Sequence, residues 1–435
     1  MKRMLVIFIV LLFVLSACIA PSEEVQEPVQ LKVLTWNEKV FNDKYGNFFR
    51  ATHPNYELEV ISVAGNMTPG ENLQKTVQNL IASENPDVVA LDMDQFEVLK
   101  KQDALISLTP LTSKDNFDIS DYTPAVVDYF TDENGQIYGL SPTFIGRALY
   151  YNKKMFDDRM IPYPSDRMTW DEVLELALLF RNESNAAEPQ YGYNYEQISN
   201  PFMMALYIGE GNGYSFYRNN EFFFDTESWE RVFQLVTDCF KYNSCYVQDS
   251  NNPSYSDLVS AQKSSYPFLE GNIAMSINDS SLYHLLTSDN NGHQELDWGI
   301  VSLPVSVDQS GLSNGIQMTD IFSITRNGDA NAGWDFIKYV CGESYTRLLP
   351  NINPEELPAI QDAEWQDEGV KVFYQLERIS NTTIQTLRSL PRAVITRMDE
   401  VSPVYMSEIL TEKATAQEVL QKLELDLQTT LNESK

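Results

Sequence analysis

Polar and aromatic side chains follow the apolar segments that we expect to form the first strands of a sheet. Trp36 and Asn37 follow the first such segment, and Asp92 and Asp94 follow the apolar run 87–91. Because open α/β sheets bind ligands at the carboxyl ends of their strands, these side chains are candidates for a binding site. An indole ring beside carboxylates and amides is suited to recognising a polyhydroxylated solute, through ring stacking and hydrogen bonds.

Covalent catalysis is a poorer fit to the sequence. The chain has 3 histidines, without the spacing of a zinc site, and we find no G-x-S-x-G, P-loop or G-x-G-x-x-G pattern. Asp92 and Asp94 are too close in sequence to flank a glycosidic bond, where the two carboxyl groups lie about 5 Å or more apart. We therefore expect no catalytic residues, no metal and no cofactor, and we keep a glycoside hydrolase only as a less favoured alternative.

The composition argues against two further classes of protein, those that bind nucleic acid and those that attach to membranes by charge. With 43% hydrophobic and 12% aromatic residues, most of the chain is expected to fold. The 62 acidic and 31 basic residues give a formal net charge of −31, which repels phosphate backbones and anionic lipid headgroups. We expect no nucleic-acid partner and no electrostatic attachment to a membrane.

The N-terminus has the pattern of an export signal. Lys2 and Arg3 precede the apolar run 4–17, which as a helix would rise only about 21 Å, short of the roughly 30 Å of a bilayer core. The run ends in a Leu-Ser-Ala-Cys motif that resembles the bacterial lipoprotein box, so Cys18 is the predicted lipidation site. The alternative is an ordinary cleavable signal with a chance cysteine. We predict a signal peptide at 1–17 and a flexible tether at 18–30.

Export would allow disulfides to form. Cys239 and Cys245 flank five residues where a helical pattern passes into a turn, so a local bridge and two unpaired thiols both remain open. Cys341 lies on the apolar side of a helical pattern and is expected to be a buried, inert thiol.

Apolar patterns of two kinds alternate along the chain. The unbroken run 87–91 is typical of a parallel strand buried on both faces, and amphipathic helices follow such runs. Capping-box patterns at Thr169 and Thr415 predict two helix starts. Trp229 and Trp334 lie on the apolar faces of two other helices and are expected in the core. The predicted class is α/β.

Four segments, at residues 73–108, 135–156, 268–278 and 298–340, occur in an order that resembles the extracellular solute-binding proteins, family 1. This resemblance implies the type II periplasmic-binding-protein fold, in which several crossover strands join two α/β lobes and the ligand lies in the cleft between them. Each lobe would be built from two stretches of sequence. We predict that residues 31–141 and 305–349 form lobe 1, and that residues 142–304 and 350–435 form lobe 2.

The resemblance also implies the site. An acid at Asp92 or Asp94 resembles the sugar-hydroxyl acceptor of the family, and Trp36 with Asn37 lies where relatives often place a binding aromatic and a polar partner. Tyr207 lies in a turn region that relatives present to the ligand. Arg147 could serve vicinal hydroxyls or a uronate carboxylate, or could form an interlobe salt bridge.

Other positions depart from the family pattern or match it less closely. Asn278 and Asp279 lie where maltose-type relatives continue with Gly-Pro-Trp, so a stacking tryptophan is missing and a maltodextrin-like ligand is less favoured. The adjacent Tyr150 and Tyr151 are expected to pack in the structure rather than bind iron. The remaining candidates, from the approach to the last cleft strand and from one late helix, are Gly315, Gln317 and Asp320, and Arg392 or Arg397.

The resemblance implies a lipid-anchored, monomeric binding protein at the extracytoplasmic face of the cell membrane. It would capture a carbohydrate, with an oligosaccharide as the expected ligand, and deliver it to the membrane permeases of an ABC importer. A peptide, a polyamine or another small solute is the alternative ligand. A non-transport lipoprotein for adhesion or sensing is a further alternative, and it would show no lobe closure.

Overall fold

The computed structural model describes most of the chain: residues 28–68, 72–181, 189–196, 198, 200–246, 266–288, 296–306, 312–361, 368–375, 378–379 and 382–434. The predicted signal peptide, Cys18 and the tether up to residue 27 lie outside these ranges. Within them, no helix combines the length and the apolar character needed to span a bilayer.

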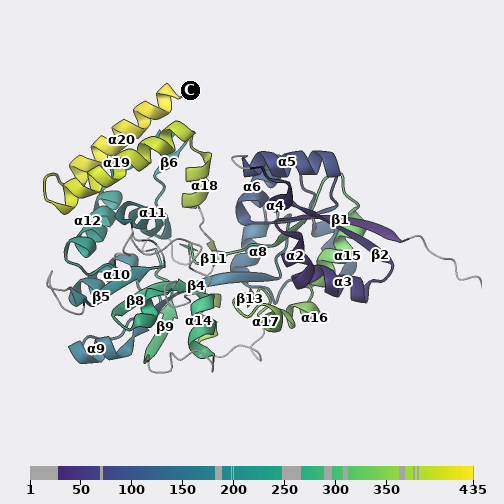
Figure 1. Ribbon diagram of the computed structural model, residues 1–435, viewed down its shortest axis with the longest axis horizontal. Coiled ribbons are helices and arrows are strands. Elements are labelled where there is room, and N and C mark those ends of the chain that lie inside the picture. The colour runs from purple at the N-terminus through teal and green to yellow at the C-terminus, as the bar shows by residue number, and fades with distance from the viewer. Residues whose placement is uncertain are drawn as a thin grey trace, which may run out of the picture.

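The first lobe is built on a four-stranded sheet, seen on the right of Figure 1. β1, β2 and β3 are parallel, and β12 joins the edge of β3 in the antiparallel sense. All four residues of β3 are buried, as the unbroken apolar run predicts. The strands in sheet order are β12 (Ile321–Ile324), β3 (Val88–Leu91), β1 (Val29–Thr35) and β2 (Tyr56–Ser62).

Helices between and after these strands cover the first sheet. Their buried aromatic side chains include Phe49 and Phe96, and Trp334 of α15 is also buried, which confirms its predicted place in the core. Asn72 caps α5 by accepting a hydrogen bond from the backbone N–H of Lys75. The helices of this part of the chain are α2 (Glu38–Phe41), the π-helix η1 (Asn42–Gly46), α3 (Asn47–Thr52), α4 (Val63–Asn66), α5 (Leu73–Glu84), α6 (Met93–Lys101), α7 (Thr109–Asp115), α8 (Pro124–Phe130), α15 (Ala330–Val340), α16 (Glu343–Thr346) and α17 (Leu349–Ile352).

The second lobe, on the left of Figure 1, is built around the long strand β4. β4 pairs with β8, β9, β11 and β13, and β5 pairs with β8 in the parallel sense. Tyr150 and Tyr151 of β4 are buried, which confirms that they pack in the structure. The strands are β4 (Thr143–Asn152), β5 (Tyr191–Tyr195), β8 (Ile273–Asp279), β9 (Trp298–Ser302), β11 (Ile316–Gln317) and β13 (Leu357–Pro358).

The helices of the second lobe include two that begin as predicted. Thr169 and Thr415 form complete capping boxes at the starts of α10 and α20, and Trp229 of α12 is buried in the core. The helices of this part are α9 (Lys153–Arg159), α10 (Trp170–Ala177), η2 (Leu178–Phe180), α11 (Pro201–Gly211), α12 (Glu227–Lys241), η3 (Pro267–Glu270), α14 (Ser280–Thr287), η4 (Val370–Tyr374), α18 (Thr382–Ser389), α19 (Arg392–Leu410) and α20 (Ala416–Glu433). Two small ladders complete the elements, β6 (Tyr217–Arg218) with β7 (Glu221–Phe222) and β10 (Leu312–Ser313) with β14 (Arg378–Ile379).

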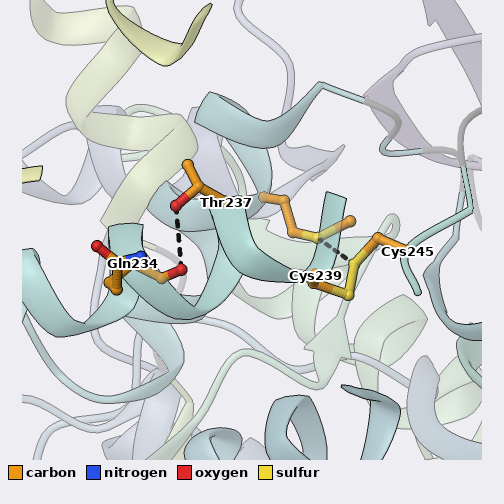
Figure 2. Close-up of a disulfide and its surroundings, with 5 residues drawn as sticks. Gln234, Thr237, Cys239 and Cys245 are labelled. Atoms are coloured by element: carbon orange, nitrogen blue, oxygen red, sulfur yellow. Dashed lines mark hydrogen bonds between the residues drawn. A yellow bond between two sulfur atoms is a disulfide. The ribbon is translucent and has the colours of Figure 1, made fainter. Parts of the chain in front are cut away.

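A disulfide joins the end of α12 to the segment beside β5. Figure 2 shows the bond between Cys239 and Cys245, and one half-turn earlier in α12 the hydroxyl of Thr237 donates to the carbonyl oxygen of Gln234. Both cysteines are buried, and Cys245 forms a parallel bridge with Tyr193 of β5. The bond therefore fixes the helix to the strand that leads into the cleft described below. Cys341 is a buried free thiol.

The chain passes between the two sheets at several points. Thr143 begins β4 directly after the first lobe, and residues 318–320 connect β11 of the second sheet to β12 of the first. The last described passage leads from α17 to β13. β11 lies beyond the predicted boundary at residue 305 and still pairs with β4, and the assignment of residue ranges to the two lobes stays a prediction.

Candidate functional site

A cleft of about 590 Å³ lies between the two lobes. Its walls are contributed by the end of β3 and the start of α6 in the first lobe, and by β4, β8 and α11 in the second. The structure brings seven of the predicted ligand-binding residues together on these walls: Asp92, Asp94, Arg147, Tyr207, Asn278, Asp279 and Gln317.

Asp92 lies where β3 ends and α6 begins. Its carboxylate caps the helix by accepting a hydrogen bond from the backbone N–H of Gln95, at 3.0 Å. Burial raises the pKa of this carboxyl group, while the Gln95 N–H and the positive charge of Arg388 act in the opposite direction. A partly buried carboxylate at a strand end is a strong acceptor for a ligand hydroxyl group.

Asp94, in the first turn of α6, forms an ion pair with Arg388 of α18. The two side chains come from different lobes, because α6 follows a strand of the first sheet and α18 packs against α11 of the second. This pair therefore links the two walls of the cleft. Figure 1 shows α18 on the side of the second lobe that faces α6.

Arg147 of β4 extends over the floor of the cleft towards Glu196. Its Nε donates to the Glu196 carboxylate, and its Nη2 lies 3.3 Å from Oε1 of Gln317. Burial alone would lower the pKa of this guanidinium, but Glu196, with contributions from Tyr195 and Asp279, outweighs burial and raises it. Both Arg147 and Glu196 belong to the second lobe, so their ion pair is not the interlobe salt bridge that was one of the two predictions for Arg147. Among the described residues, the ion pair between the lobes at this cleft is the one between Arg388 and Asp94.

Three tyrosines supply the aromatic surface of the cleft. Tyr195 ends β5 and is buried, whereas Tyr207 of α11 and Tyr266 are partly exposed. Burial, with a contribution from Asp279, raises the pKa of Tyr266 to about 12, and burial also raises the pKa of Tyr207. At neutral pH these phenols are uncharged, so each offers a ring face for stacking and a hydroxyl for hydrogen bonding.

Asn278 and Asp279 end β8 at the same edge. Asp279 caps α14 through the N–H of Ser281, at 3.0 Å, and Asn278 donates to the hydroxyl of Ser276, at 2.6 Å. Because β5 and β8 are parallel, their carboxyl ends place Glu196 beside these two residues.

Trp36 and Asn37 do not line this cleft. They line a neighbouring cavity of about 400 Å³ in the first lobe, which shares Asp92 and Gln317 with the cleft. The side chain of Asn37 caps α2 by accepting a hydrogen bond from the N–H of Val40, so Asn37 has a structural role.

The other candidates are placed elsewhere. Gly315 is buried, and its carbonyl oxygen accepts from the N–H of Arg147, at 2.7 Å. Asp320 forms an ion pair with Lys44, and Arg397 pairs with Asp426 of α20 rather than reaching the cleft.

Some lining residues were not predicted from the sequence, namely Glu196, Asn314, Glu355 and Arg388, together with Tyr195 and Tyr266. Glu196 could have been found, because it directly follows the Tyr-rich segment 191–195, which forms a parallel strand. Arg388 and Glu355 carry no local signal, since tertiary packing alone brings them to the cleft.

A cleft of this composition is suited to binding a polar solute. No group of three histidine, cysteine or acidic side chains in the described part of the chain could hold a metal ion. Two α/β lobes with a polar, tyrosine-containing cleft between them define the class of bilobal solute-binding proteins. The sequence pattern of one family, the bacterial extracellular solute-binding proteins, matches residues 45–364. The chain belongs to this family, which assigns it to the extracytoplasmic side of the cell.

Solved structures share the fold. A sugar transporter protein from Rhizobium etli in an open conformation superposes with a TM-score of 0.64 at 18% identity, covering 92% of this chain and 99% of that one. The sugar-binding protein MalE from Xanthomonas citri gives a TM-score of 0.64 at 15% identity, with 93% and 98% covered. An ABC substrate-binding protein from Listeria monocytogenes, solved in complex with cycloalternan, gives 0.57 at 18% identity, with 93% and 99% covered. These similarities confirm the two-lobed fold predicted from the sequence.

Proposed function

We propose that this protein captures a carbohydrate, with an oligosaccharide as the preferred ligand, in the cleft between its lobes and delivers it to the permeases of an ABC importer. It acts as a monomer and is held at the extracytoplasmic face of the membrane by lipid on Cys18. Like its family, it binds solutes and returns them chemically unchanged.

The observation that carries this proposal is the lining of the cleft. Tyr207 and Tyr266 offer ring faces, and Asp92 and Asp279 offer carboxylates, around a volume of about 590 Å³. This combination matches the two faces of a pyranose, which has an apolar surface and a rim of hydroxyl groups. Bilobal relatives with the same fold include one solved with a cyclic oligosaccharide, which agrees with this ligand class.

Capture is tested with sugars of known structure. We expect a neutral gluco- or galacto-configured trisaccharide to bind in calorimetric titration, to raise the melting temperature and to lower the radius of gyration as the lobes close. Chromatography should recover the sugar intact. If no neutral sugar binds and a peptide or polyamine does, the carbohydrate assignment is wrong. Recovery of shortened sugar would favour the hydrolase alternative.

Asp92 is the residue of the first lobe on which we expect that affinity to depend. Asp92→Asn should weaken binding of the sugar about tenfold or more, because an amide oxygen is a poorer acceptor than a carboxylate. Asparagine retains the helix cap, so the melting temperature should change little. The matched control is Asp329→Asn, which alters the cap of α15 outside the cleft. If the two variants bound the sugar with equal affinity, Asp92 would not be a ligand-binding residue.

Anchoring is tested separately. Cys18→Ser should abolish incorporation of labelled lipid and release the protein from the membrane fraction, because the proposed acyl acceptor is the thiol of Cys18. Cys341→Ser, which replaces a buried thiol, is the control and should be labelled normally. Normal labelling of Cys18→Ser would contradict the anchor without affecting the proposed ligand.

A further inference from the structure

We propose that the cleft selects solutes that donate hydrogen bonds, namely neutral and amino sugars, and that it rejects acidic sugars because Glu196 already occupies Arg147. This inference rests on the proposed function and specifies its substrate class. It depends on how the charged and polar groups of the cleft are already paired.

The guanidinium group of Arg147 is engaged on each of its three nitrogens. Nε donates to the carboxylate of Glu196, Nη1 lies 3.5 Å from the carbonyl oxygen of Asn314, and Nη2 lies 3.3 Å from Oε1 of Gln317. A sugar carboxylate that approached this guanidinium would find its positive charge already balanced by Glu196 and would meet the negative charge of Glu196 at close range.

Glu196 is held in this position by its backbone. It adopts a left-handed conformation with φ at 42°, which is uncommon for a residue other than glycine. Its N–H donates to the carbonyl oxygen of Ile277 at 2.8 Å, and its own carbonyl oxygen accepts from the side chain of Asn194 at 3.0 Å. These two contacts fix the backbone of Glu196 at the end of β5, and its side chain reaches Arg147 from this position.

Arg388, the other guanidinium of the lining, is paired with Asp94. The lining contains five carboxylates and two guanidinium groups, so pairing each guanidinium with one carboxylate leaves three, those of Asp92, Asp279 and Glu355. The excess charge that a ligand meets is negative, which disfavours a second anion and favours hydroxyl or ammonium donors.

Asn314 provides an independent indication of the same preference. Its side chain is 4% exposed and lines the cleft, and its Nδ2 donates to the carbonyl oxygen of Tyr207 at 3.1 Å. Its Oδ1 is buried and has no hydrogen-bond partner among the described residues. A buried acceptor left unsatisfied is costly, so a ligand that opened access to this oxygen and donated a hydrogen bond to it would be favoured over one that can only accept.

The experiment compares sugars of the same ring configuration that carry no charged group, an amino group or a carboxylate. The probes are the neutral, 2-amino and 6-carboxylate forms of gluco- and galacto-configured sugars, as monomers and trimers, with spermidine as a non-sugar cation. For the configuration that binds, we expect the neutral and amino forms to bind and the uronate form to bind at least about tenfold more weakly. A uronate that binds as tightly as its neutral counterpart overturns the inference and leaves carbohydrate capture intact.

Glu196→Gln tests the residue itself. Releasing the guanidinium of Arg147 should reduce the discrimination against the uronate to about threefold or less, because the sugar carboxylate can then take the place of Glu196. The control is Glu175→Gln, which removes a carboxylate paired with Arg231 on the exposed surface of the same lobe and should preserve the discrimination. Unchanged discrimination in folded Glu196→Gln overturns the role of Glu196. If spermidine binds and no sugar does, the ligand is not a sugar, but the preference of the cleft for hydrogen-bond donors stands. If no probe binds, both this inference and the proposed function are contradicted.

Discussion

Lys44→Met is expected to lower the free energy of unfolding by about 3 kcal/mol or more, because it leaves two carboxylates without their cation. Nζ of Lys44 lies 2.7 Å from Oδ2 of Asp320 and 2.7 Å from Oε2 of Glu356. The lysine side chain is 8% exposed, so water cannot replace the lost charge. Burial opposes the charged form of Lys44, but Asp320 and Glu356 outweigh it and raise the pKa above the usual lysine value.

Because the pKa of Lys44 is raised in the folded protein, the stability that Lys44 contributes depends on pH. A lysine whose pKa is higher in the folded than in the unfolded protein stabilises the fold below the unfolded value of 10.5, and this stability is lost as pH rises through the folded pKa. The difference in unfolding free energy between the wild type and Lys44→Met should therefore be constant near neutral pH and shrink above about pH 10.5.

Lys39→Met is the matched control in the preceding helix. The Lys39 side chain is 86% exposed and pairs with Asp43, at 2.6 Å, so we expect a change below about 1 kcal/mol. Urea denaturation of both variants, at neutral and alkaline pH, measures the difference. If Lys44→Met were no less stable than Lys39→Met, the buried network would contribute nothing to the fold.

The position of this network explains its importance. Asp320 lies in the connection between the two sheets, and Glu356, which also accepts from the hydroxyl of Thr143, lies beside β13 at the start of β4. Lys44 thus ties a helix of the first lobe to the segments that cross between lobes.

No sequence pattern could have revealed that network. Lys44 is separated from Asp320 by 276 residues and from Glu356 by 312, and the intervening chain contains most of both lobes. By contrast, the capping boxes at Thr169 and Thr415 were predicted correctly, because every group that forms them lies within four consecutive residues.

The cleft shows the same division between local and long-range information. Asp92 and Asp279 could be anticipated because Asp92 directly follows an apolar strand and Asp279 ends one, and the carboxyl ends of such strands meet in open α/β sheets. Arg147 was predicted as a candidate, but its role depends on Glu196, 49 residues away. The sequence therefore left the hydroxyl and uronate interpretations open, and the pairing of Arg147 in the structure favours the hydroxyl interpretation.

Trp334→Ala is expected to lower the free energy of unfolding by about 3–5 kcal/mol through the cavity that it leaves. The indole is 3% exposed, packs edge-on against Phe117 with ring centroids 5.4 Å apart, and donates from Nε1 to Asp115 at 3.1 Å. It lies in α15, on the sheet of the first lobe and outside the cleft, so the folded fraction should bind the neutral sugar with near-normal affinity.

Trp36→Ala should have the opposite effects. Trp36 is 52% exposed and lines the cavity that adjoins the cleft at Asp92, so removing it should change the free energy of unfolding by less than about 1 kcal/mol. If a trisaccharide extends from the cleft into that cavity, the lost ring contact should weaken its binding about tenfold, while a monosaccharide held in the cleft alone should be unaffected. Calorimetric titration of both sugars beside urea denaturation of both variants separates the two tryptophans. Unchanged trisaccharide affinity in Trp36→Ala would show that the ligand stays within the cleft, because the substitution alters the wall of the neighbouring cavity and leaves the cleft as it was.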